Sequence, residues 1–190
     1  SHLRYREQAS IGNIYDLDKE VIKQLAAHLK KDSRYLYTKS NIKKKPNFAR
    51  LNDNHQYQQI KTLTKSLAQT SDSQFILYSE ITDLSIDMEN KADWKFWQSE
   101  EQNRHFNFSV FVYDGINGEQ IFDKTYQSQS HWDFDKRESV SPQSQKFWQS
   151  KFGSNITRLL ADVALDIDEL LMCQPTQGTI LNIEENNLLI

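Results

Sequence analysis

The chain has 190 residues, of which 37% are hydrophobic and 12% aromatic, and its formal net charge is -3 with a pI near 6.0. This length fits one domain with room for a fragment of another, and the apolar content argues against disorder. The acidic balance gives no support to nucleic-acid binding, which needs a basic surface. Cys173 is the only cysteine, so an internal disulfide is excluded, and no apolar run approaches the ~20 residues of a membrane span.

The N-terminal part predicts alternating strands and helices. Apolar and charged residues alternate between Leu3 and Gln8, which predicts the tail of a strand. Apolar residues spaced by four predict a helix from Leu17 to Lys31. A short strand is expected at residues 33–38. A capping-box pattern at Asp53 then predicts a second helix that runs to about Ala68.

The central stretch, from Gln74 to Ser130, predicts three consecutive antiparallel strands. Apolar and polar residues alternate along each of them, which is typical of half-buried strands because successive side chains leave opposite faces. The loop from Asp114 to Glu119 contains two glycines, an Asp and an Asn, which supply the positive-φ positions of a tight hairpin.

The connection between the first two central strands, from Asp87 to Arg104, is long for a hairpin and carries Trp94, Phe96 and Trp97. Long loops in small domains are often functional, and tryptophan is enriched in interface hot spots. The alternative is that these rings fold back as a lid over one end of the sheet.

A final long helix is expected to begin at Ser141-Pro142, with a hydroxyl cap and a proline in the first turn. Its apolar stripe runs to Leu171, and Gly153 is expected to bend or split it. We therefore predict one domain over residues 1–174. Residues 175–190 are interpreted as a linker and the truncated start of a C-terminal β domain. The element order predicts an α+β fold in which helices cover a mixed, largely antiparallel sheet.

The sequence contains no recognised catalytic or metal-binding motif. The five histidines show no HExxH pattern and no short Cys/His spacing, so we predict no metal site. Glycine-rich phosphate loops and the GxSxG elbow are absent as well. We predict no catalytic residues, no cofactor and no enzyme activity; the alternative is an enzyme whose site is assembled from distant positions.

Several segments carry a resemblance to a known family. They are Glu7 to Ile14, Ser33 to Leu36, Gln74 to Asp83, Arg104 to Glu119 with the strand that follows, and Cys173-Gln174-Pro175 leading into Gly178 and Ile180. In this order they resemble the middle domain of the flagellar assembly protein T family and its join to a small C-terminal β domain.

The resemblance implies a non-catalytic structural protein of the bacterial flagellar basal body, in the H ring of a polar, sodium-driven flagellum. It implies a periplasmic location near the outer membrane. The implied partners are other basal-body ring proteins and copies of itself. The implied fold is a two-layer sandwich like the N-terminal domain of TolB. Under this hypothesis Trp94, Phe96, Trp97 and Trp132 are expected at a contact surface. The alternative is a periplasmic accessory or ligand-binding module of the same type, unrelated to flagella.

Overall fold

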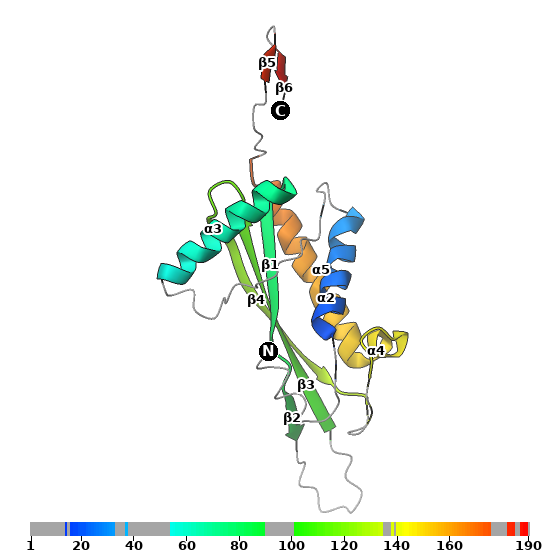
Figure 1. Cartoon of the computed structure of the whole chain (residues 1–190). Coiled ribbons are helices and arrows are strands. Elements are labelled where there is room, and N and C mark those ends of the chain that lie inside the picture. The colour runs from blue at the N-terminus through cyan, green and yellow to red at the C-terminus, as the bar shows by residue number, and fades with distance from the viewer. Residues whose placement is uncertain are drawn as a thin grey trace, which may run out of the picture.

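The computed structural model describes residues 14, 16–32, 37, 54–89, 101–134, 138, 140–175, 182–184 and 187–189. Figure 1 shows the elements in chain order: α2 (Leu17–Asp32), α3 (Asn54–Ser71), β1 (Phe75–Asp83), β2 (Ile86–Glu89), β3 (Glu101–Asp114), β4 (Gln120–His131), α4 (Gln145–Gln149), α5 (Lys151–Met172), β5 (Asn182–Glu184) and β6 (Asn187–Leu189). The strands predicted at residues 3–8 and 33–38 lie outside the described residues, apart from Tyr37.

The sheet is organised around β3, the longest strand. β4 pairs with residues 103–113 along one edge of β3, while β1 and β2 pair with residues 107–114 and 101–104 along the other edge. All pairs among these four strands are antiparallel, so the antiparallel part of the prediction is confirmed. β5 and β6 form a separate two-stranded antiparallel sheet.

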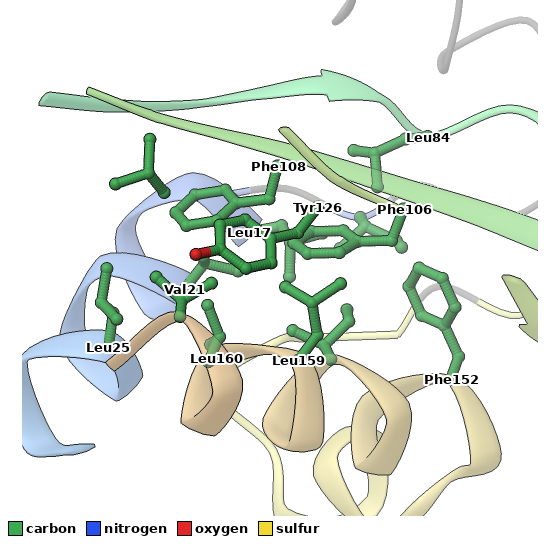
Figure 2. Close-up of a cluster of buried hydrophobic side chains, with 14 of the residues drawn as sticks. Leu17, Val21, Leu25, Leu84, Phe106, Phe108, Tyr126, Phe152, Leu159 and Leu160 are labelled. Atoms are coloured by element: carbon green, nitrogen blue, oxygen red, sulfur yellow. The ribbon is translucent and has the colours of Figure 1, made fainter. Parts of the chain in front are cut away.

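One face of the sheet packs against α2 and α5 and forms the main core (Figure 2). Alternate side chains of β3 point into it because the strand has a period of two residues. These side chains are at most 1% exposed: Phe106, Phe108, Val110 and Val112. The helices contribute the residues that the sequence pattern placed on their apolar stripes: Leu17, Val21, Leu25 and Leu29 from α2, and Ile156, Leu159, Leu160, Val163 and Ile167 from α5.

A second, smaller core lies on the opposite face, beneath α3. Ile60 of α3 packs there with Tyr78 of β1 and with Phe111 and Tyr113 of β3, and the two tyrosine rings meet edge to face at 5.6 Å. The hydroxyl groups of Thr64 and Tyr78 lie 3.2 Å apart. Helices therefore cover both faces in this half of the sheet, and the expected two-layer arrangement is wrong there. The cause is that residues 108–113 of β3 are buried on both sides.

The β3–β4 hairpin has the turn chemistry that the sequence predicts, with one difference. The Asp114 carboxylate accepts hydrogen bonds from the N–H groups of Ile116 and Asn117, at 2.7 and 3.2 Å. Only Gly118 of the two loop glycines has a positive φ, of 74°. Gly115 is instead needed for close approach, because a Cβ there would lie 2.5 Å from the Cβ of Ala68.

The predicted long helix is split into α4 and α5 at Ser150. The hydroxyl groups of Ser144 and Ser150 accept from the N–H groups of Phe147 and Gly153 and so cap the two helices. The predicted start at Ser141 is therefore wrong by one turn. The break precedes the glycine that was expected to cause it, because a serine cap supplies the acceptor that a new helix start needs.

Candidate interaction surface

The end of the sheet that holds β2 carries the long connection expected to contact partners. We call this end the arm and define it as residues 86–89, 101–106 and 127–131; Figure 1 shows it extending beyond α2 and α3. The predicted bounds of the connection, Asp87 and Arg104, are wrong, because residues 86–89 and 101–104 pair as strands. Glu89 pairs with Glu101, so the two ends of the remaining connection, residues 90–100, are held side by side. Trp94, Phe96 and Trp97 lie in this connection, outside the described residues, and their contact role stays a prediction.

Short-range contacts anchor β2 to β3. His105 Nε2 lies 2.6 Å from Asp87 Oδ2, and the N–H of His105 donates to the carbonyl of Ser85 at 2.8 Å. Ser85 in turn donates its N–H to the carboxylate of Asp83 at 2.9 Å. These contacts hold the short segment that separates β1 from β2, so both strands follow the same edge of β3.

Opposite the main core, the face of the sheet between the second core and the end of the arm is polar. We call it the polar half-face and define it by the outward residues of three strands: Glu80 and Thr82 of β1, His105, Asn107 and Ser109 of β3, and Thr125, Gln127, Gln129 and His131 of β4. Thr125, Gln127 and Gln129 are exposed, whereas Ser109 is buried and lies 2.8 Å from the Thr125 hydroxyl. The half-face thus presents amides and hydroxyls that can both donate and accept hydrogen bonds.

Trp132, the fourth predicted contact residue, lies in the main core. It is only 2% exposed, and its ring packs edge to face on Phe134 and Phe152, with centroid distances of 4.9 and 5.5 Å. The guanidinium carbon of Arg104 lies 4.6 Å from the centre of the Trp132 ring. The expectation that this ring faces a partner is therefore corrected: its side chain continues the inward-facing series of β4 and supports the arm from inside.

Two ion pairs fasten helices to the β3–β4 hairpin. The Glu119 carboxylate accepts from Lys61 and from Tyr57, both on α3, and these hydrogen bonds, led by that of Lys61, lower the pKa of Glu119.

Asp166 of α5 makes the second fastening. It accepts from Lys124 and Tyr126 of β4, each at 2.5 Å. The hydrogen bond from Lys124 is the largest cause of the lowered pKa of Asp166, and burial is the largest cause of the raised pKa of Tyr126. The two carboxylates therefore hold the hairpin between helices on both faces of the sheet.

The described residues bear on metal binding and on membrane crossing. Among them, no three His, Cys, Asp or Glu side chains gather where they could hold a metal ion. Cys173 is exposed just after α5. In the same part of the chain, no helix combines the length and the apolar character needed to cross a membrane.

Two features of this end of the sheet were not predicted from the sequence. The polar half-face had a signal, because every second residue from Asp123 to His131 is polar, and the polar residues His105, Asn107 and Ser109 alternate with apolar ones in β3. The burial of Arg104 had no such signal in the sequence. A charged side chain in an alternating strand is normally expected on the solvent side, whereas the side chain of Arg104 is 1% exposed.

Comparisons with known proteins give a family and a fold. Residues 1–142 match the family described as "Flagellar assembly protein T, middle domain". The structure is similar to that of the hypothetical protein CT253 from Chlamydia trachomatis, with a TM-score of 0.57 and 13% identity over 84% of this chain and 87% of that one. Lipoprotein GNA1162 from Neisseria meningitidis gives a TM-score of 0.32 and 11% identity over 56% of each chain, which is too weak to carry an argument. No curated protein sequence matches significantly.

Proposed function

Since the chain belongs to the flagellar assembly protein T family through that family's middle domain, we propose that it is a non-catalytic building block of the H ring in the basal body of a polar, sodium-driven flagellum. Membership makes the chain part of a flagellar assembly protein. The match over residues 1–142 is the observation that carries the proposal. The ring, the periplasmic location near the outer membrane and the TolB-like character of the fold are our extension of it.

The proposed contact surface comprises the polar half-face and the connection that carries Trp94, Phe96 and Trp97. Three observations support it. The half-face carries the exposed amides of Gln127 and Gln129, β2 and β3 hold the ends of the connection together, and the side chains that anchor the arm are buried on the other face. Aromatic anchors surrounded by polar groups are typical of protein interfaces. The proposed partners are neighbouring basal-body ring proteins and further copies of this chain.

We also propose a domain boundary near Gln174. α5 belongs to the main core as far as Leu171. Beyond it, the side-chain amide of Gln74 donates to the carbonyl of Pro175 at 2.7 Å. Among the described strands, β5 and β6 pair only with each other. These observations support a linker from residue 175 onward that leads into a C-terminal β domain.

A deletion strain complemented with variants tests the ring proposal. The deletion is expected to abolish the outer ring of isolated basal bodies in electron micrographs and to reduce swimming. Complementation with Trp94→Ala combined with Trp97→Ala is expected to weaken ring incorporation while leaving the thermal midpoint of the purified protein nearly unchanged.

Leu165→Ala is the matched control, because Leu165 is a large apolar residue that is 63% exposed on α5, away from the arm. It should restore rings and motility fully. Normally ringed, motile cells in the deletion strain would refute the ring proposal. A large fall in the thermal midpoint of the double tryptophan variant would show instead that these rings belong to the core.

A further inference from the structure

Four polar side-chain atoms are buried on the core face of the arm. They are Gln102 Oε1, Ser128 Oγ, Ser130 Oγ and Trp132 Nε1, and no residue in the described part of the chain gives any of them a hydrogen-bond partner. Gln102 is 9% exposed and Trp132 is 2% exposed. The great majority of buried polar atoms in proteins are hydrogen-bonded, either to other protein groups or to ordered water. Four buried atoms without a hydrogen bond at one place therefore need an explanation.

The register of the sheet brings these four atoms together. Ser130 lies opposite Arg104 and Ser128 opposite Phe106, and the N–H of Trp132 donates to the carbonyl of Gln102 at 2.7 Å. These side chains therefore leave the same face at two alternate pairs of the β3–β4 ladder and at the Gln102–Trp132 contact just beyond its end. We call this set of four atoms the polar niche.

Strand geometry keeps the hydroxyl groups of the niche from satisfying each other. Residues two apart on a strand have Cα atoms about 7 Å apart, and their side chains stand roughly parallel. The oxygens of Ser128 and Ser130 thus lie well beyond the ~3 Å limit of a direct O–H···O bond. A single water spans at most about 5.5 Å between two hydroxyl oxygens, so each serine needs a water of its own or a partner on another residue. The two serines are also the smallest inward-facing side chains of β4.

The chemistry of the niche selects the bridging molecule. Gln102 Oε1 only accepts, Trp132 Nε1 only donates, and each serine hydroxyl can do both. An anion could pair with the nearby Arg104 guanidinium but would leave the amide oxygen unsatisfied, and a cation would be repelled by Arg104 and would leave the indole N–H unsatisfied. We propose that the polar niche is an internal hydration site, in which ordered water bridges β4 to Gln102 and Trp132. Buried waters of this kind make two to four hydrogen bonds to polar groups that lack other partners.

Crystallography and NMR of the full chain test this proposal. At atomic resolution, an electron-density peak is expected within hydrogen-bond distance of at least two of the four atoms. In protein labelled with ¹⁵N at its tryptophans, the indole N–H of Trp132 should show NOE and ROE cross-peaks to water of opposite sign, as for a long-lived bound molecule. Trp132→Phe assigns that signal by removing it. Ser128→Ala combined with Ser130→Ala should abolish the density peak.

Ser66→Ala, at an exposed serine of α3, is the matched control and should leave both signals unchanged. A direct bond between Gln102 Oε1 and Trp132 Nε1 with no density in the niche would overturn the proposal. So would an anomalous peak at this position in bromide-soaked crystals, which would indicate an anion. If the double serine variant does not fold, the density and the NOE of the unchanged protein decide the question alone. None of these results depends on the flagellar role.

Discussion

Two leucines of α5, five residues apart, allow the buried face of the main helix to be tested directly. Leu160 is 0% exposed and lies in the main core, whereas Leu165 is 63% exposed (Figure 2 shows Leu160 pointing toward the sheet). Replacing Leu160 by alanine removes buried apolar surface and leaves a cavity. Substitutions of this kind cost about 2–5 kcal/mol in the free energy of unfolding.

The same replacement at Leu165 should change that free energy by no more than about 0.5 kcal/mol, because surface substitutions rarely do more. For a chain of this size, the Leu160→Ala loss corresponds to a fall of about 4–20 °C in the thermal midpoint. The assay is urea unfolding followed by far-ultraviolet circular dichroism, with the m-value checked for constancy. A loss below about 1 kcal/mol for Leu160→Ala, or equal losses in both variants, would refute the assignment of the buried face.

Three further predictions concern single contacts. Gly153→Ala should destabilise the chain by about 1–3 kcal/mol, measured by urea unfolding, because the new Cβ would lie 2.1 Å from the carbonyl oxygen of Phe147. Asp166→Asn should lower stability at pH 7 by less than about 1 kcal/mol. The pKa of Asp166 is lowered from 3.8 in the folded state. The contribution of its carboxylate to the free energy of unfolding is therefore present above pH 3.8 and is lost as the pH falls through the lowered pKa. The difference between the unfolding free energies of wild type and variant should accordingly shrink in acid. Arg104→Lys should cost about 0.5–2 kcal/mol in a thermal or urea melt, because an ammonium group cannot stack on Trp132 as a planar guanidinium does.

Matched substitutions on α5 serve as controls for the first two of these predictions. Glu169→Ala, on the exposed face, should leave the free energy of unfolding nearly unchanged, and a stability of Gly153→Ala equal to it would contradict the steric argument. Asp162→Asn, one turn before Asp166 and exposed, removes the same charge from α5 and is the matched control for Asp166→Asn. If Arg104→Lys melts like the unchanged protein, the stacking of Arg104 on the ring contributes nothing to stability.

Periodicity predicted the elements whose residues face one core. The alternation in β3 and the spacing of four in α2 each place a full stripe of side chains against the same layer, and both stripes are buried in the structure. The same rule of alternation failed to predict the second core. Residues 108–113 form an almost continuous apolar run, which indicates burial on both faces, but a period of two accounts for only one of them.

The candidate surface was only partly predictable. A tryptophan just after a strand is equally compatible with a surface anchor and with a core ring; the outcome for Trp132 depends on Phe152 and Arg104, which are distant in sequence. The position of the helix break depends likewise on which serine can reach an unpaired N–H. Tertiary packing decides the burial of Trp132 and the position of the helix break, so a local sequence pattern does not predict them.

The length of β3 has a mechanical consequence. Its 14 residues run from the arm to the hairpin and pair on one edge with β4 over almost their whole course, and on the other edge with β1 and β2. Because β3 itself joins the arm to the hairpin, tension along the strand axis is carried by its covalent backbone, while the strands on both edges keep it from bending. Tension between the arm and the far end of the domain would thus act on a strand that is hydrogen-bonded along both edges.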